Sequence, residues 1–256
     1  MINALALALT LYWMLEYMVR RASYRAEMEP ARFQPPWQTG CDWTIVISPG
    51  FWLSHYFKSR IQHFTGANAV SARRTLIARS NWLNVLVSVI FLILSLLTTL
   101  AARGTLGWSL VADLVVVRYI SRTTEIGYAF GRDVMTPTDN RSGLDKHARL
   151  TLALRSCVEL FLLAMPVYLL CVPHYGTVLK ALTLSLSVGT LTNVGYGLPL
   201  DQHGFRALLV FPQVIATLSL VLLSLATYIS RPEPKPEPES APEEKRNQND
   251  GFVLHR

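Results

Sequence analysis

The pattern of apolar and polar positions predicts a chain that crosses a membrane several times. Residues 82–101 form a run of twenty residues without a charge, and about twenty apolar residues are needed to cross the hydrocarbon core. A cluster of basic residues at 73–79 precedes this run, so we expect its helix to run from inside to outside. A short turn on the outer side follows, and residues 108–121 are predicted to form a second helix that crosses back to the inner side. Residues 81–121 are therefore predicted to form two transmembrane helices.

The first eighty residues are harder to assign. Residues 1–19 are mostly apolar but contain Glu16, and they carry no positively charged start or small-residue cleavage site of a signal peptide. They are predicted to form a first transmembrane helix running inward, with an interfacial helix as the alternative. Residues 20–80 interleave aromatic and basic side chains, a composition typical of a segment at the headgroup level. We expect a cytoplasmic or interfacial region there.

Two polar stretches are expected on the cytoplasmic side. Residues 122–155 contain a cluster of turn-forming residues at 136–140 and predict a linker that is helical at both ends. Residues 231–256 begin with alternating proline and glutamate. Such a sequence cannot bury a core, so we expect a disordered cytoplasmic tail.

The most informative stretch, residues 156–230, combines two apolar runs with a short helix and a glycine-containing loop. Residues 156–173 and 205–230 are long enough to approach or cross the membrane, and residues 178–189 predict a short helix between them. Thr190 to Gly197 then form a loop. Backbone that is not helical at membrane depth must satisfy its polar groups in another way, and lining an ion path is one such way.

The loop suits a row of backbone carbonyls that face a dehydrated cation. Thr192, Asn193 and Val194 precede a Gly-Tyr-Gly sequence that ends at Gly197. Glycine lacks a Cβ and can take the positive-φ conformations that turn successive carbonyls to one side. Carbonyl rings of this kind replace the hydration shell of potassium. The alternative is an ordinary glycine loop between the helices of a transporter.

These residues resemble the selectivity filter of the potassium-channel superfamily. The resemblance covers residues 156–230: an outer helix, a pore helix, a filter at 192–197 and an inner helix. It implies a homotetramer whose four loops surround one ion path, with K⁺ bound by the following residues: Thr192, Asn193, Val194, Gly195 and Tyr196. The predicted fold class is an all-α membrane protein, a multi-span helical bundle with a re-entrant pore helix and a selectivity filter.

Two positions depart from the family pattern. Asn193 stands where the family has a second threonine, and its larger amide both donates and accepts hydrogen bonds. Leu198 stands where the family usually has an acidic residue, so we expect a less rigid outer filter. Asp201 is a further candidate for the outer mouth. In the inner helix, which has no glycine, Pro212 is the expected site of any kink.

The ionisable residues inside or near the later predicted spans include Asp113, Arg118 and Glu159. Such residues usually face the bundle interior and form pairs. We expect Asp113 to pair with a neighbour and Arg118 to extend toward the inner surface. Glu159 is expected to pair with Arg155 or with a basic residue of the preceding span. Arginines at every third position, as in a voltage sensor, are not found.

Composition supports a membrane location and a sidedness. The chain has 256 residues, of which 51% are hydrophobic and 16% charged, with a net charge of +7. Twenty-one of the 24 lysines and arginines lie at 20–80, 118–155 and 231–256, on the predicted cytoplasmic side, which satisfies the positive-inside rule. The filter loop then enters from the outer face of a plasma or inner membrane. Because many of the basic residues lie next to membrane spans, we interpret the positive charge as a signal of membrane topology. We expect it to contact lipid rather than nucleic acid.

The leading hypothesis is a passive cation channel that conducts or prefers potassium and needs no cofactor. A second hypothesis is a non-conducting, pore-like membrane sensor or assembly protein, which Asn193 and Leu198 favour. An enzyme is not expected, because the histidines, acids and cysteines form no triad, carboxylate pair or metal-ligand spacing. The gating stimulus, the choice between potassium and sodium and any cytoplasmic partner stay open.

Overall fold

The computed structural model describes residues 2–25, 48–62, 67–101, 106–135, 146–172, 177–192 and 208–225. Within these ranges the secondary structure is entirely helical, as predicted, and no strand occurs. The helices are α1 (Ile2–Arg25), α3 (Pro49–Gln62), α4 (Ala67–Ala101), α5 (Leu106–Met135), α6 (Lys146–Cys171), α7 (Val178–Gly189) and α9 (Val210–Thr217), and a π-helical segment, η3 (Leu218–Leu225), continues α9.

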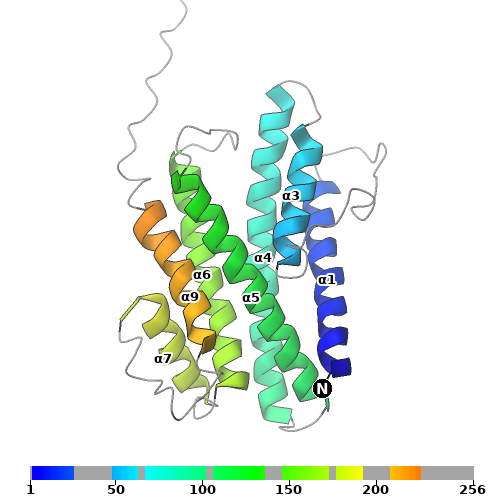
Figure 1. The fold of residues 1–256 in the computed structure, drawn as a ribbon, viewed down its shortest axis with the longest axis vertical. Coiled ribbons are helices and arrows are strands. Elements are labelled where there is room, and N and C mark those ends of the chain that lie inside the picture. The colour runs from blue at the N-terminus through cyan, green and yellow to red at the C-terminus, as the bar shows by residue number, and fades with distance from the viewer. Residues whose placement is uncertain are drawn as a thin grey trace, which may run out of the picture.

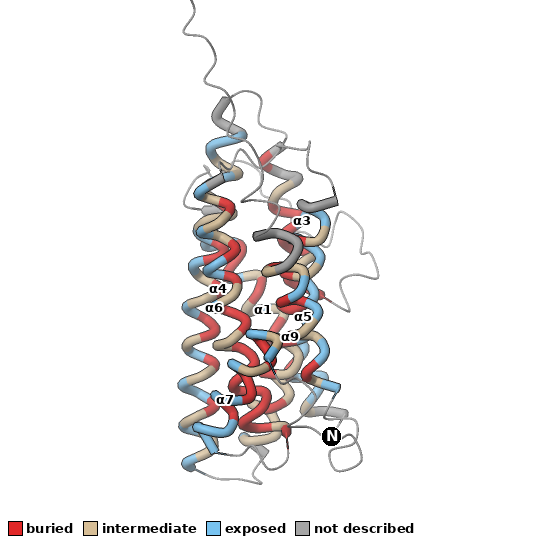
Figure 2. The backbone as a smooth tube through the Cα atoms, turned by 90° about the vertical axis from the view of Figure 1, so that its left-hand side faces the viewer, coloured by how far each residue is buried: buried red, intermediate tan, exposed pale blue. Residues whose placement is uncertain are grey.

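The long helices stand side by side in one bundle (Figure 1). α4 packs along α6, α1 packs along α5, and α5 also contacts α9 and η3. The short helix α7 lies against α6 and α9 at the same end of the bundle as the N-terminus (Figures 1 and 2). α5 and α9 approach each other at Gly127, where a Cβ would lie 3.7 Å from the Cα of Ala216, at ordinary van der Waals distance.

Among the helices that the structure describes, two are long and apolar enough to cross a membrane. They are α4 over Val70–Ala101 and α6 over His147–Cys171. The outer face of α4 presents large apolar side chains, among them Trp82, Ile90 and Leu97, each more than half exposed. Figure 2 shows this pattern as exposed positions along α4, while the sides of the helices that face one another are buried. Such an exposed apolar face fits contact with lipid.

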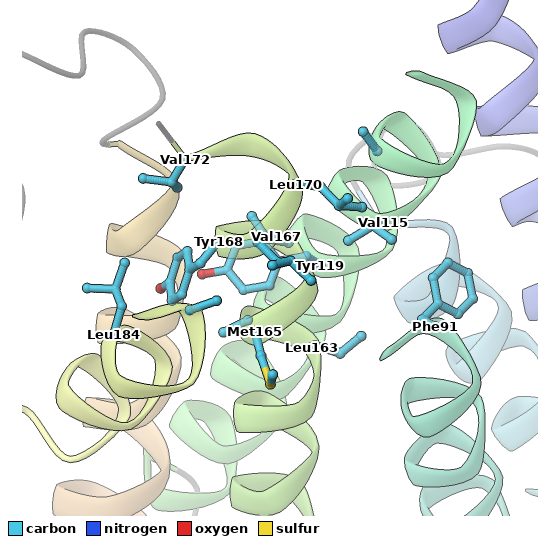
Figure 3. Close-up of a cluster of buried hydrophobic side chains, with 14 of the residues drawn as sticks. Phe91, Val115, Tyr119, Leu163, Met165, Val167, Tyr168, Leu170, Val172 and Leu184 are labelled. Carbon is cyan, nitrogen blue, oxygen red and sulfur yellow. The ribbon is translucent and has the colours of Figure 1, made fainter. Parts of the chain in front are cut away.

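The main core joins six helices around two buried tyrosines. Tyr119 of α5 and Tyr168 of α6 have no exposed surface, and Figure 3 shows their rings beside Leu184 of α7. The Tyr119 hydroxyl donates to the carbonyl oxygen of Leu209 over 2.7 Å. Because this core includes side chains of α7 and α9, it fixes the short helix relative to the bundle.

Three aromatic residues of α3 are packed rather than half-wet. Trp52, Tyr56 and Phe57 of α3 are all buried, in a cluster with Leu76 of α4. The expected headgroup-level exposure of these three rings is therefore wrong, because α3 buries them against α1 and α4. The part of this region at 26–47 lies outside the described residues.

The helix after the loop deviates from regular geometry at η3 rather than at Pro212. Pro212 is the third residue of α9, and in the first turn a missing N–H costs no intrahelical hydrogen bond. The π-helical hydrogen bonding begins at Leu218 and runs to Leu225. Single π turns often mark functional positions in a helix. The predicted tail at 231–256 lies outside the described residues.

Candidate functional site

Two features of the bundle are candidates for function: the short helix α7 with the turn that follows it, and a buried cluster of charges. α7 has the bounds predicted from the sequence. Its apolar face is buried through Ala181, Leu184 and Val188. With twelve residues it extends only about 18 Å, short of the roughly 30 Å of hydrocarbon in a bilayer. It therefore ends within the depth of the bundle.

A chain of three buried hydrogen bonds ties α7 to the helices on both sides. The Ser185 hydroxyl donates to the carbonyl oxygen of Phe161 on α6 over 2.9 Å. The Gln213 amide of α9 donates to the carbonyl oxygen of Ser185 over 3.0 Å, and it accepts from the Tyr168 hydroxyl over 2.6 Å. Gln213 has no exposed surface. A fully satisfied buried network of this kind rigidifies its surroundings.

The C-terminal end of α7 is fitted closely against the same two helices. A Cβ on Gly189 would lie 2.1 Å from Cε1 of Phe161 and 2.8 Å from the Gln213 amide nitrogen. Contacts this short do not occur, so a side chain here would force α7 away from α6 and α9. Position 189 therefore has room only for glycine, which has no side chain.

We therefore expect Gly189→Ala to destabilise the protein by about 1–3 kcal/mol, the usual cost of overpacking a filled core. Thermal unfolding in detergent, followed by circular dichroism, measures the change. The matched control is Gly131→Ala, because nothing lies within 4 Å of a Cβ built at Gly131 of α5. There the added methyl raises helix propensity, and the unfolding temperature should hold or rise. Equal behaviour of the two variants would contradict the close fit.

The chain turns sharply after α7, where the predicted filter begins. Leu191 has a φ of 58°, a left-handed conformation that costs a non-glycine residue about 1–2 kcal/mol. The Thr190 hydroxyl donates to the carbonyl oxygen of Leu186 over 2.7 Å and lies 2.8 Å from the Thr192 hydroxyl. Thr192 is exposed at the end of this turn. The other predicted site residues of the loop lie outside the described residues: Asn193, Val194, Gly195, Tyr196, Gly197, Leu198 and Asp201.

The second feature is a charge cluster of six buried residues from three helices. Its members are Glu16 and Arg20 of α1, Arg118, Arg122 and Glu125 of α5, and Glu159 of α6. It contains three arginines and three carboxylates and is neutral as a set. The pairing is continuous across the bundle, so that α1, α5 and α6 are joined by ionic hydrogen bonds.

Arg122 is the centre of the charge cluster. Its Nε and Nη2 donate to the two carboxylate oxygens of Glu159 over 2.7 and 2.8 Å, and its Nη1 donates to Glu125. Arg20 contacts both oxygens of Glu125 through its Nη2, at 2.7 and 2.8 Å. The two-pronged geometry between Arg122 and Glu159 is the strong form of this interaction. Glu159 therefore pairs with the basic residue at 122 of the preceding helix.

Arg118 does not extend to the inner surface, contrary to expectation. It has no exposed surface, because Glu16 supplies a counter-ion inside the bundle, 2.8 Å from its Nη1. Its guanidinium carbon also lies 5.4 Å from the centroid of the Phe91 ring, a cation–π distance. Asp113, more than one turn earlier on α5, is half-buried and is not a member of the charge cluster.

The N-terminus of α3 meets the carboxylates of the charge cluster. A Cβ on Gly50, the second residue of α3, would lie 2.9 Å from Oε2 of Glu125 and 3.2 Å from Oε2 of Glu16. Ser48, just before the helix, accepts a hydrogen bond from the Phe51 N–H over 3.3 Å. The partial positive charge of a helix N-terminus favours nearby carboxylates, so α3 adds to the stabilisation of both acids.

The sequence contained signals for several of these charges but not for their pairing. Glu16 interrupts an apolar run, and Arg118, Arg122 and Glu125 follow one another at helical spacing. The contact between α1 and α5, which brings Glu16 to Arg118, has no signal in the sequence of either helix. Arg20 and Glu125 were missed as partners because each was expected in a cytoplasmic segment.

Within the described ranges, no group of three or more histidine, cysteine, aspartate or glutamate side chains is arranged to hold a metal ion. Oxygen ligands at the predicted filter would instead be backbone carbonyls. No protein-family model matches the chain, and neither a curated protein nor a solved structure is significantly similar to it.

Proposed function

We propose that the chain is one subunit of a homotetrameric membrane channel that conducts potassium passively, or prefers it among cations. The observation that carries this proposal is the position of α7. A helix too short to cross a bilayer is held between α6 and α9 and ends three residues before Thr192, where the filter-like sequence begins. No covalent chemistry and no cofactor belong to the proposal, and K⁺ is the permeant ligand.

The end of α7 suits a cation path on electrostatic grounds. The C-terminus of a helix carries a partial negative charge of about half an electron, which favours cations. In the proposed channel, the carbonyls of residues 192–196 replace the hydration shell of the ion. Gln213 and Ser185 attach α7 rigidly to its neighbours. This attachment matters because a ring of carbonyls selects among ions only if the helix that supports it does not move.

Assembly into a tetramer is supported by the exposed apolar faces of the two helices that flank the loop. Leu179 of α7 is 73% exposed and Ile215 of α9 is 62% exposed, and Phe211 of α9 is about half exposed. Apolar surface of this kind is normally covered by lipid or by another protein chain. Four copies arranged with cyclic symmetry around the loop would bury part of this apolar surface and enclose the ion path.

The experiment that tests the proposal is a reversal-potential measurement on the full chain in proteoliposomes with a potassium gradient against sodium. We expect a potassium-selective current in the wild type and a larger potassium-to-sodium permeability ratio in Asn193→Thr. The threonine hydroxyl is a smaller oxygen ligand than the amide of Asn193, which also donates. A tetrameric wild type that passes no ions across pH, lipid composition and membrane tension would contradict the proposal.

The charge cluster favours a second candidate function, a non-conducting membrane sensor or assembly protein. Ionisable residues buried in a helical membrane bundle commonly mark functional positions, and the pair of Arg122 and Glu159 belongs to α5 and α6 rather than to the filter-like sequence. The same measurement separates the two functions. A sensor would stay silent in the flux assay while keeping its fold and its oligomeric state.

A further inference from the structure

A cavity with charged and apolar side chains in its wall lies beside the charge cluster, between α3, α4, α5 and α6. Its volume is about 90 Å³, several times the roughly 10–15 Å³ that a single water requires by the same measure. Three cations line it, Arg20, Lys58 and Arg122, with Glu125 as the carboxylate. The cavity is large enough for a ligand of several atoms.

The charge balance around this cavity is positive. The six residues of the charge cluster neutralise one another, and Lys58 of α3 is an additional cation at the cavity wall. Lys58 is half-buried and makes no hydrogen bond or ion pair with the described residues. An uncompensated ammonium in a partly enclosed space is costly unless an anion or water pairs with it. Among the described residues, this cation therefore has no counter-ion of its own in the cavity wall.

The pKa of Lys58 reflects this imbalance. Burial lowers it most, and the charges of Arg20, Arg73 and Arg122 lower it further, so that despite the opposing effect of Glu125 the pKa falls to about 8. An anion bound beside the ammonium would raise the pKa again, since opposite charges favour the ionised form. Ligand binding and protonation of Lys58 are thus linked.

The cavity also presents buried polar atoms without partners. The side-chain oxygens of Asn81 and Asn84 and the Nε of Arg20 are buried and have no hydrogen-bond partner, the nearest acid to that Nε being Glu16 at 3.6 Å. Both asparagines line the cavity and are more than nine-tenths buried. Each amide can present either its oxygen or its N–H₂ by rotation of the terminal group. Unpartnered buried groups of this kind indicate a missing ligand or ordered water.

We propose that this cavity binds a phosphate-type anion, held by Lys58 together with amide and hydroxyl donors from α3 and α4. A tetrahedral anion with several oxygens can use donors that converge from different helices, which a halide uses less well. The hydroxyls of Ser54 and Ser80 line the same cavity. The anion is either free phosphate or the headgroup phosphate of an anionic phospholipid, and the inference goes beyond ion conduction and does not depend on it.

Lipid is a physically reasonable source because of where the cavity lies along α4. Asn81 and Asn84 stand at the start of the uncharged run 82–101, where the expected hydrocarbon region begins. Apolar side chains, among them Phe130 and Leu152, form the rest of the wall. Such a wall can accept the glycerol and upper acyl carbons of a lipid, whereas free phosphate would contact only the polar side.

The test measures the unfolding temperature of the full chain in micelles of a non-ionic, phosphate-free detergent during two titrations, one with sodium phosphate and one with phosphatidylglycerol. Sodium chloride at matched ionic strength is the reference. A ligand that binds the folded state raises the unfolding temperature in proportion to its occupancy. The variants are Lys58→Gln, Lys58→Arg and, as matched control, the exposed Lys180→Gln of α7.

We expect one of the two titrants to raise the unfolding temperature of the wild type, Lys58→Arg and Lys180→Gln. For Lys58→Gln, at least about 10-fold more ligand should be needed, because the variant loses a hydrogen bond from a charged group. At about pH 10, above the pKa of Lys58, the wild type should lose affinity and Lys58→Arg should keep it. The titrant that acts identifies the source as free anion or lipid headgroup.

Three results would overturn the proposal. They are no response of the wild type beyond chloride, an unchanged response in Lys58→Gln, and equal loss of affinity at high pH in wild type and Lys58→Arg. Size-exclusion chromatography and circular dichroism establish that each variant is folded. If Lys58→Gln does not fold, the proposal is tested by the loss of ligand affinity at high pH, compared between the wild type and Lys58→Arg.

Discussion

Replacing Gly195 by alanine is expected to abolish potassium flux while leaving the fold intact. In the proposed filter this glycine takes a conformation that turns its carbonyl toward the ion, and a Cβ disfavours that conformation by about 1–2 kcal/mol per residue. All four subunits of the proposed tetramer carry this substitution, and their loops surround the same ion path. The loss of aligned carbonyls should reduce flux to the level of empty liposomes.

The measurement is potassium flux into proteoliposomes, with equal protein incorporation in every sample. The control is Gly131→Ala, which adds the same methyl group to α5 where nothing lies within 4 Å. That variant should conduct as the wild type does. Because the buried apolar core is built from the helices, the unfolding temperature of Gly195→Ala should stay within a few degrees of the wild type.

Wild-type flux in Gly195→Ala would show that these residues do not form a carbonyl filter. The short helix would then be an ordinary structural element, and the channel proposal would be left with no selectivity site. Loss of flux together with loss of the tetramer is a different result, because it would assign Gly195 to assembly. Cross-linking in the liposomes distinguishes this case.

The parts of the fold that could be predicted are those with a strong local pattern. The bounds of α7 follow from its amphipathic periodicity and from the glycine at 189 that ends it. The uncharged run at 82–101 predicted a membrane-length helix, and the candidate span of α4 begins twelve residues earlier, at Val70. Helix propensity and tertiary contacts with α3 extend the helix where hydropathy alone gives no signal.

The parts that could not be predicted depend on contacts between distant segments. α3 is only fourteen residues long and mixes aromatic with polar residues, so its composition fits an interfacial helix as well as a packed one. Its burial comes from Trp13 and Tyr17 of α1, which pack against its aromatic side chains. The pairing of Arg118 with Glu16, across 102 positions of the chain, likewise arises only when α1 lies against α5.

Removing one carboxylate of the charge cluster should have the largest effect on stability. Glu159→Gln keeps the shape of the side chain but leaves the buried guanidinium of Arg122 with Glu125 as its remaining acid. Breaking a buried pair from one side costs about 3–5 kcal/mol. For a chain of this size that corresponds to a fall in unfolding temperature on the order of 10 °C, measured by circular dichroism in detergent.

A double-mutant cycle separates the pair from its surroundings. We expect Arg122→Gln to be destabilised about as strongly as Glu159→Gln. The double variant should lose less stability than the sum of the losses of the two single variants, by about 0.5–3 kcal/mol. The matched control is Asp113→Asn, which removes a half-buried acid of α5 outside the charge cluster. If Glu159→Gln unfolds at the temperature of Asp113→Asn, the ion pair does not hold α5 to α6, and packing of the apolar core must do so alone.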